Sequence, residues 1–149
     1  MHPDEYQTIM DYEDRIAALD YKLNQKRDVV ERTWGHYKVL HKGDGYTVKE
    51  LTILPGKSLS DQRHFKRDEH WLVIKGTLMV ELQHEKHFGG KRYTVLLTDE
   101  SLDQTRDLSY YIIPKETWHR PYNEGTEPVV VVETWLGNSS EDDIERRNV

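Results

Sequence analysis

Four side chains in the middle of the sequence have the donor types and spacing of ligands around one centre. Gln62 and His64 are two positions apart, so an extended strand places both on the same face. Glu69 opens the next β-rich run after a short connection, and a hairpin would bring its carboxylate beside that pair. His119 lies on a later predicted strand, which a barrel would close onto the same interior. Two imidazoles, a carboxylate and a carboxamide are together able to ligate a metal ion.

These side chains need strands to position them, and the sequence from Trp34 onward is typical of an all-β protein. Short runs rich in β-branched and aromatic residues alternate with Gly, Pro, Asn and Asp, as in strands joined by turns. The predicted strands are Tyr46–Leu54, Trp71–Leu82, Tyr93–Thr98, Tyr110–Ile113 and Val129–Trp135. Without a βαβ alternation, such strands indicate a sandwich or a small barrel. The polar stretch 83–107 is expected to hold a long hairpin or loop.

The first 30 residues predict an amphipathic helix. Residues 4–28 contain no glycine or proline, and apolar residues recur at spacings of three and four. They are Ile9, Tyr12, Ile16, Leu19 and Leu23. This narrow stripe would pair with a second copy in a homodimer or pack on the chain's own sheet. The expected organisation is a helix over 1–30, a β-barrel domain over 31–138 and a solvated polar tail over 139–149.

Composition limits the class of protein. A chain of 149 residues is long enough for one domain with a core. No apolar run approaches the roughly 20 residues of a membrane helix. Cysteine is absent, which excludes disulfides and thiolate sites, and the N-terminal sequence lacks the features of a secretory signal. We therefore expect a cytoplasmic protein without a membrane partner. Nucleic acid is not an expected partner, because Lys and Arg form no basic cluster.

The chain resembles the cupin superfamily in both of its sequence motifs. The positions of the first motif, G-x5-H-x-H-x4-E-x6-G, are held here by Gly56, Gln62, His64, Glu69 and Gly76. Gln62 stands where most cupins have histidine. The second motif, ending P-x-G-x2-H-x3-N, is matched by Pro114, His119 and Asn123. Because cupins are jelly-roll β-barrels, the resemblance implies that fold. It also implies one divalent metal ion (Mn, Fe, Co, Ni or Zn), held by Gln62, His64, Glu69 and His119.

A narrower resemblance, to the cupin domain of type II mannose-6-phosphate isomerases, covers residues 31–144. It is carried by the segments Glu31–Tyr37, Gly45–Thr52, Leu59–Ser60, Arg67–Trp71, His119–Arg120 and Glu141–Ile144. The resemblance implies a small-molecule sugar phosphate as partner, with interconversion of mannose 6-phosphate and fructose 6-phosphate through an enediol. In that family a guanylyltransferase domain commonly precedes this one. Its Gly-rich nucleotide-binding signature is absent here, so guanylyl transfer is not expected.

Basic residues near the motifs are the candidates for handling such a substrate. A metal ion would stabilise negative charge on the sugar oxygens, which leaves phosphate binding and proton transfer to the protein. The predicted phosphate contacts are Lys49, Arg67 and Arg120, together with Lys66. For proton transfer the candidates are Lys49 on an inward strand face, Lys66 if it is desolvated, and Arg67. The resemblance to the family implies that Arg67 is important for activity. An arginine is too basic to act readily as a general base, so stabilisation of the phosphate or the enediolate is its expected role.

Two other functions stay open on the same residues. Phe65 and Lys66 stand where family members usually have histidine, which favours a non-catalytic cupin that binds a sugar or nucleotide sugar. His64, Glu69 and His119 also resemble the two-His, one-carboxylate set of non-haem iron oxygenases. Oxygen uptake that depends on Fe²⁺ would be the mark of that chemistry. The sequence thus predicts a sugar-phosphate isomerase first, with a binding protein and an oxygenase as alternatives.

Overall fold

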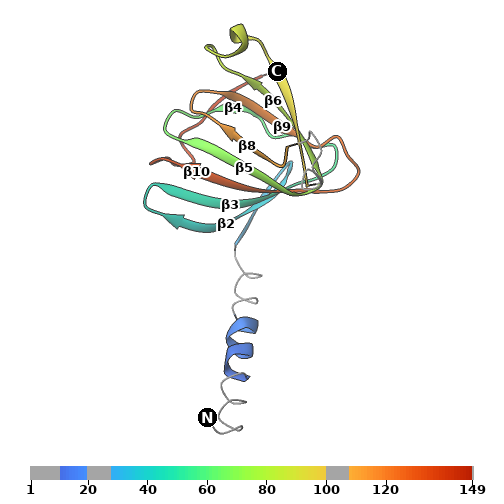
Figure 1. The fold of residues 1–149 in the computed structure, drawn as a ribbon, viewed down its shortest axis with the longest axis vertical. Helices are drawn as coiled ribbons and strands as arrows, with labels where there is room; N and C mark the ends of the chain where they lie inside the picture. The colour runs from blue at the N-terminus through green and yellow to red at the C-terminus, as the bar shows by residue number, and fades with distance from the viewer. Residues whose placement is uncertain (1–10, 20–27, 100–107, 149) are drawn as a thin grey trace.

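The computed structural model describes residues 11–19, 28–99 and 108–148. Residues 11–19 are helical, and every one of them is exposed. The blue helix in Figure 1 is this segment. The predicted N-terminal helix is therefore confirmed for these residues, while Ile9 and Leu23 of its apolar stripe lie outside the described part. Neither this helix nor any other in the described ranges is long and apolar enough to cross a membrane.

From Val29 onward the described chain is built mainly of antiparallel strands, which confirms the all-β expectation. One sheet has six strands in the order β1-β2-β3-β10-β5-β8. Its strands are β1 (Val29–Arg32), β2 (Gly35–Gly43), β3 (Tyr46–Ile53), β10 (Val129–Leu136), β5 (Asp68–Lys75) and β8 (Tyr110–Ile113). Since β10 pairs with both β3 and β5, it joins segments that are far apart in the sequence.

The second sheet has five strands in the order β11-β4-β9-β6-β7. Its strands are β11 (Glu145–Arg147), β4 (Asp61–Arg63), β9 (Trp118–Tyr122), β6 (Thr77–Gln83) and β7 (Tyr93–Thr98). The two sheets form the walls of a flattened barrel, as Figure 1 shows. This is the jelly-roll barrel that the cupin motifs predict.

The core lies between the two sheets, because buried and more exposed residues alternate along the long strands. Every second residue of β3, β6 and β10 is buried, and Trp71 of β5 is completely buried. Three inward positions carry charged side chains instead of apolar ones: Lys49, Glu69 and Glu133. Burying charged groups is costly unless they are paired, so these positions mark a site within the barrel.

The predicted strands are present, except that one predicted run is divided into two strands. The predicted run 71–82 is two strands, β5 and β6, separated at Gly76, where the backbone φ is +86°. A Cβ there would lie 3.1 Å from Val129 Cγ2, so this tight turn favours glycine. The polar stretch after β6 forms the expected hairpin with β7 and contains a short 3₁₀ turn, η1 (Phe88–Gly90). Residues 100–107 lie outside the described part.

The segment after β10 belongs to the fold, which corrects the prediction of a solvated tail over 139–149. At Gly137 the backbone φ is +132°, and a Cβ would lie 2.2 Å from the carbonyl oxygen of Lys66. The chain therefore passes close to the turn between β4 and β5. Asp143 accepts hydrogen bonds from the backbone N–H groups of Phe65 and Lys66, both at 2.9 Å. Beyond it, β11 pairs with β4.

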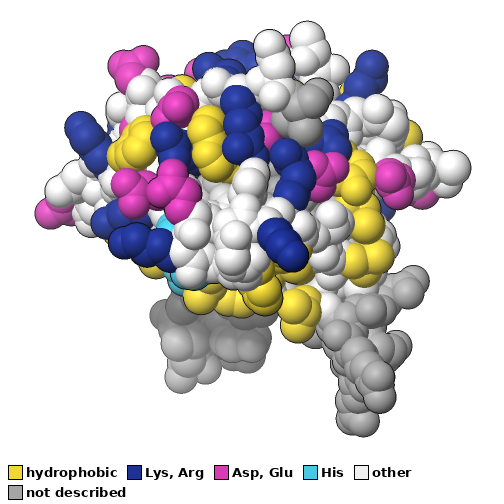
Figure 2. Space-filling model, turned by 90° about the horizontal axis from the view of Figure 1, so that it is seen from above, with side chains coloured by type: hydrophobic (Ala, Val, Ile, Leu, Met, Phe, Trp, Pro, Cys, Tyr) yellow, Lys and Arg dark blue, Asp and Glu magenta, His cyan; other side chains and the backbone are white. Residues whose placement is uncertain are grey.

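The outer face of the six-stranded sheet carries an apolar patch. Leu72 and Ile74 of β5 and Tyr110 and Ile112 of β8 are between 39% and 48% exposed. Leu72 lies opposite Tyr110 in the pairing of the two strands. Figure 2 shows hydrophobic side chains gathered along one side of the molecule. Patches of this kind are more often found at interaction surfaces than on free monomers.

Candidate functional site

Three of the predicted ligands meet inside the barrel. His64 follows β4, Glu69 lies on β5 and His119 on β9, and their ligand atoms all lie within 4.8 Å of one another. His64 Nε2 is 3.0 Å from Glu69 Oε1, and His119 Nε2 is 3.3 Å from Glu69 Oε2. All three residues are buried. A buried carboxylate between two imidazoles is a donor set suited to a divalent transition metal or zinc.

Backbone carbonyls orient both imidazoles so that Nε2 points toward the carboxylate. His64 Nδ1 is 2.6 Å from the carbonyl oxygen of Asp143, and His119 Nδ1 is 2.9 Å from that of Thr117. A carbonyl oxygen can only accept, so Nδ1 carries a proton and Nε2 of the neutral ring presents its lone pair. His119 Nε2 is buried and has no hydrogen-bond partner in the described part of the chain. A bound cation would satisfy this nitrogen, so the residues fit a divalent metal ion.

Glu69 requires a positive partner at this position. Burial opposes its ionisation, but His119 and His64 hold the pKa of the Glu69 carboxyl well below its usual range. Burial likewise disfavours protonated His119, yet Glu69 raises the pKa of His119 above its ordinary value. Trp71 Nε1 also donates to Glu69 Oε2 at 3.0 Å. The carboxylate is therefore kept ionised, ready for a metal ion or a protonated imidazole.

Gln62, the fourth predicted ligand, lies beside the cluster. It stands opposite His119 in the pairing of β4 with β9, so the two side chains share one face. Its Oε1 is 3.5 Å from Ser60 Oγ, and its side chain lines a cavity next to the cluster. The structure thus brings Gln62 to the same side of the barrel wall as the three buried ligands.

Arg67 is in direct contact with the cluster. Its Nε donates to Glu69 Oε1 at 3.0 Å, and its Nη2 is 3.2 Å from His64 Nε2. Its Nη1 donates to Ser139 Oγ and to the carbonyl oxygen of Ser140, both at 3.1 Å. The guanidinium carbon also lies 3.5 Å from the ring centre of Trp135. The residue predicted for catalysis and substrate binding is therefore fixed within the site.

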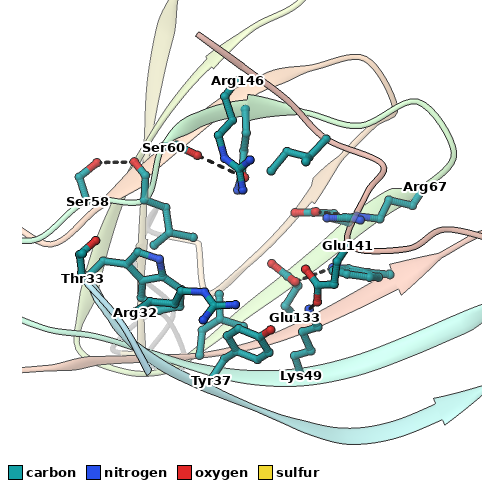
Figure 3. Close-up of a pocket in the computed structure, with 17 residues that line it drawn as sticks. Arg32, Thr33, Tyr37, Lys49, Ser58, Ser60, Arg67, Glu133, Glu141 and Arg146 are labelled. Carbon is teal, nitrogen blue, oxygen red and sulfur yellow. Dashed lines mark hydrogen bonds and ion pairs between the residues drawn. The ribbon is translucent and has the colours of Figure 1, made fainter. Parts of the chain in front are cut away.

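A cavity of about 310 Å³, drawn in Figure 3, adjoins the cluster. Glu69 and Gln62 are among the residues that line it. This volume lies in the range of small-molecule pockets. Four cationic residues line the cavity: Arg32, Lys49, Arg67 and Arg146. Its lining carboxylates are Glu69, Glu133 and Glu141. His64 and His119 do not line it, so Glu69 and Gln62 connect the His64–Glu69–His119 cluster to the space that a ligand would fill.

Lys49 faces this cavity from β3, as the sequence predicts. It is buried, and its Nζ lies 3.8 Å from the ring centre of Trp135 and 4.5 Å from that of Tyr37. It also forms an ion pair with Glu141 of the segment after β10. Two aromatic faces and a carboxylate therefore hold Lys49 as a fixed positive group in the cavity wall.

Lys66 and Arg120, two of the predicted substrate residues, do not line the cavity. The Lys66 side chain is exposed, so the desolvation that a lysine base requires is not met. Arg120 follows His119 on β9, and neighbouring side chains of a strand point to opposite faces. It pairs with Glu81 and lies over the ring of Tyr122, 4.5 Å from its centre. Arg120 therefore belongs to the outer surface of the five-stranded sheet.

Sequence reasoning missed three charged cavity residues that lie on strands. Glu133 of β10 lies opposite Lys49 of β3, Arg146 of β11 lies opposite Gln62 of β4, and Arg32 closes β1. For Glu133 a signal was available, because Glu-x-Trp occurs at 69–71 and again at 133–135. The two arginines lie in short charged strands, whose inward positions follow only from their pairing partners.

Comparison with known proteins identifies the family. The family described as "Mannose-6-phosphate isomerase C-terminal" matches residues 20–148. The chain belongs to this family. Among curated relatives, a mannose-1-phosphate guanylyltransferase of Salmonella muenchen is 31% identical over 144 residues, which cover 96% of this chain and 27% of that protein. The alginate biosynthesis protein AlgA of Pseudomonas aeruginosa is 34% identical over 146 residues, 97% of this chain and 27% of AlgA. The mannose-6-phosphate isomerase C-terminal domain thus spans about a quarter of the curated relatives it matches.

Solved structures confirm the cupin fold of this family member. The capsular polysaccharide assembling protein CapF of Staphylococcus aureus superposes with a TM-score of 0.68 at 17% identity, covering 82% of this chain and 32% of CapF. An oxalate decarboxylase of Lactobacillus farciminis gives a TM-score of 0.64 at 15% identity, covering 82% of this chain and 34% of that one. At these identities the likeness shows the fold alone.

Proposed function

We propose that this domain is a divalent-metal-dependent sugar-phosphate isomerase that interconverts mannose 6-phosphate and fructose 6-phosphate. One observation carries the proposal: the buried His64–Glu69–His119 cluster adjoins a cavity lined by four cationic residues. A sugar phosphate has a carbonyl carbon to be polarised and a dianionic phosphate to be neutralised, and the cavity has groups for both tasks. Membership of the mannose-6-phosphate isomerase C-terminal family supports this choice of substrate.

The metal ion would be held by His64, Glu69 and His119, with Gln62 as the fourth ligand. When bound, a divalent ion would stabilise the negative charge that develops on the sugar oxygens during isomerisation. Arg67 supports this task from the protein side, because its guanidinium already contacts Glu69 and faces the cavity.

Arg32 and Arg146 are the residues that we assign to the phosphate. Both line the cavity, and Figure 3 shows both pointing into it. Lys49 and Arg67 are already paired with carboxylates. Arg32, by contrast, donates to the carbonyl oxygen of its neighbour Glu31 at 2.9 Å, and its guanidinium keeps further donors for a phosphate. Guanidinium groups suit bidentate contacts with phosphate, so these two arginines replace Lys66 and Arg120 in that role.

The decisive test is turnover by the purified protein with Mn²⁺, Co²⁺ or Zn²⁺, compared with His119→Ala. We expect interconversion of mannose 6-phosphate and fructose 6-phosphate that falls at least about 10³-fold in the variant and on chelation. Bound metal, measured by elemental analysis, should fall with it. His84→Ala changes a histidine of the β6–β7 hairpin and is the matched control. It should keep both the turnover and the bound metal of the wild type. Mannose without phosphate should be a poor substrate. Turnover that survives both chelation and His119→Ala would contradict the proposal.

A metal-free sugar-binding cupin is the second candidate, and the contacts of Arg67 favour it. This guanidinium contacts both Glu69 Oε1 and His64 Nε2, so it supplies a positive partner to the carboxylate without an ion. Calorimetric binding of a sugar phosphate or nucleotide sugar, without turnover with any metal, would support this candidate. Oxygen uptake that depends on Fe²⁺ would instead support the oxygenase alternative.

A further inference from the structure

A second buried carboxyl group, outside the metal cluster, lies in the wall of the cavity. Glu133 is 6% exposed and stands on β10 between Lys49 of β3 and Trp71 of β5. Trp135 Nε1 donates to Glu133 Oε1 at 2.5 Å. Its other oxygen, Oε2, has no hydrogen-bond partner within the described ranges, and Figure 3 shows the side chain at the cavity. One carboxyl oxygen is therefore anchored while the other is left for a ligand.

Glu133 and Glu69 occupy equivalent positions on neighbouring strands. Each is followed two residues later by a tryptophan whose indole N–H donates to its carboxylate. The antiparallel register places Glu69 opposite Trp135 and Glu133 opposite Trp71, so the two Glu-x-Trp pairs lie side by side in opposite directions. The two glutamates differ in their imidazole contacts, because His64 and His119 both contact Glu69.

This difference gives the two carboxyls opposite proton affinities. Burial raises the pKa of Glu133 to about 8, and the negative charge of Glu69 adds to the rise, while Lys49, Arg67 and Trp135 oppose it. The imidazoles hold the pKa of Glu69 well below its usual range. Enzymes use two carboxyl groups with different pKa values in one site for two roles. The group with the low pKa stays ionised, and the group with the high pKa accepts and donates a proton.

We propose that Glu133 is the catalytic acid and base that carries the proton between C1 and C2 of the sugar phosphate. The inference rests on the isomerase function proposed above and names the group that function needs. The other candidates are less suited, because Lys66 is exposed, Lys49 is paired with Glu141, and Arg67 is an arginine bound to Glu69. Glu133 has a free oxygen at the cavity and no ion-pair partner within hydrogen-bond distance in the described part.

The proposed step conserves every proton and electron. The Glu133 carboxylate takes the proton from C2 of the open-chain aldose, and the C2–H electron pair becomes the second bond of C1=C2. The π pair of the C1 carbonyl moves onto O1. The hydroxyl on C2 then loses its proton as O1 gains one, and the C2 carbonyl forms. Glu133 returns its proton to C1, which gives the ketose, so nothing is oxidised or reduced overall.

The test compares the wild type with Glu133→Gln in deuterated water. Glutamine keeps an oxygen that can accept from Trp135 Nε1 but cannot carry the proton. We expect wild-type levels of bound metal, a wild-type melting temperature at about pH 6, and deuterium incorporation at C1 and C2 that is about 10³-fold slower. Glu50→Gln is the matched control, because Glu50 lies on the outer face of the same sheet, opposite Val132. It should exchange at the wild-type rate.

A second variant keeps the inference testable if Glu133→Gln fails to fold. Trp135→Phe removes the donor that favours ionised Glu133, so the rising limb of kcat/KM should move about one pH unit upward. Other groups that titrate or carry charge surround Glu133: Tyr37 from β2, Lys49 from β3, Glu69 from β5, Arg67 before it, His119 from β9 and Glu141 after β10. All of these are retained in the variant. A Trp135→Phe profile identical to that of the wild type would count against Glu133.

The outcomes separate this inference from the proposed function. If the wild type is active and the turnover rate of Glu133→Gln lies within about fivefold of the wild-type rate, the role of Glu133 is overturned. The proposed isomerase function would stand in that case, since loss of a general base lowers the rate far more. A metal-loaded wild type that neither isomerises nor exchanges any proton of the sugar phosphates would overturn both. Slow exchange in Glu133→Gln alone, with metal and fold retained, supports both.

Discussion

Glu133 and Glu69 show how strongly the neighbours of one residue decide its charge. Both are buried glutamates on adjacent strands with an indole donor of their own. The imidazoles around Glu69 keep it ionised, whereas Glu133 has a pKa of about 8 because burial dominates. At the scale of the residue, the site therefore combines a permanent anion with a group that titrates near neutrality.

The raised pKa of Glu133 predicts a specific dependence of stability on pH. The pKa is about 8 in the folded protein, against an ordinary value of 4.5, so the folded state holds this proton more tightly. The resulting stabilisation is present at low pH and is lost as the pH rises toward about 8. Glu133→Gln removes the dependence. In metal-free protein, the variant should gain about 2–3 kcal/mol in free energy of unfolding over the wild type between about pH 6 and pH 9.

Urea unfolding of both proteins at the two pH values measures this difference. Glu50→Gln, on the outer face of the same sheet, should follow the wild type. If the gap between the wild type and Glu133→Gln stayed constant with pH, Glu133 would be ionised throughout this range.

At the scale of elements, the segment after β10 positions His64 and Arg67 from outside the two cupin motifs. Its Asp143 carboxylate holds the backbone N–H groups of Phe65 and Lys66, and its carbonyl oxygen accepts from His64 Nδ1. Ser139 and Ser140 of the same segment bind Arg67. The site is therefore assembled by two chain segments that approach each other at Gly137.

Asp143→Ala should weaken metal binding although Asp143 is not a ligand. Without the carboxylate, the turn that carries His64 loses two hydrogen bonds, and we expect metal affinity to fall about 10- to 100-fold. Metal titration followed by calorimetry measures this. Asp142→Ala changes an exposed neighbour and should keep the wild-type affinity. Equal affinities for both variants would show that β4 and β5 hold the turn by themselves.

The sequence predicts the long strands and fails for the short ones, for a physical reason. β3, β6 and β10 contain alternating apolar residues that must face a core, so their pattern is visible locally. β4 and β11 have the sequences Asp-Gln-Arg and Glu-Arg-Arg, and they are strands only because they pair with each other and with β9. Such strands are determined by tertiary contacts rather than by propensity.

The same distinction applies to the site. His64, Glu69 and His119 were predictable because a local motif and a second motif give their spacing. The cavity opposite them was not, since Glu133 reaches it through the register of β10 with β3 and β5. Arg120 was misplaced because its closeness to His119 in sequence puts it on the opposite face of β9. Proximity along a strand is thus a poor guide to proximity in a site.

At the scale of the whole molecule, the exposed helix over residues 11–19 offers a candidate interface for the expected homodimer. Tyr12, Ile16 and Leu19 share its apolar stripe and are 65%, 49% and 54% exposed. Apolar residues at heptad spacing are typical of helices that pair with a second copy. We therefore propose that two chains associate through this stripe. Ile16→Lys should then shift the protein from dimer to monomer in sedimentation at micromolar concentration.

The apolar patch on the outer sheet face supplies the control for this prediction. Ile74 is 48% exposed on β5, and Ile74→Lys should leave the dimer intact if the helix forms the interface. The reverse result, a dimer that survives Ile16→Lys and dissociates with Ile74→Lys, would place the interface on the six-stranded sheet. A wild type that sediments as a monomer would exclude both surfaces at that concentration.

The closing of the site by the segment after β10 also sets an order of events during synthesis. His64 and the Asp143 carbonyl that orients it are 79 residues apart in the sequence. One edge of β4 stays unpaired until β11 has been synthesised and can pair with it. Contacts across such separations form late, because they require most of the loop entropy to be lost first. A nascent chain therefore leaves the ribosome with its His64 imidazole unoriented until Asp143 emerges. Capture of the proposed metal ion is therefore expected to conclude the folding of this barrel rather than to nucleate it.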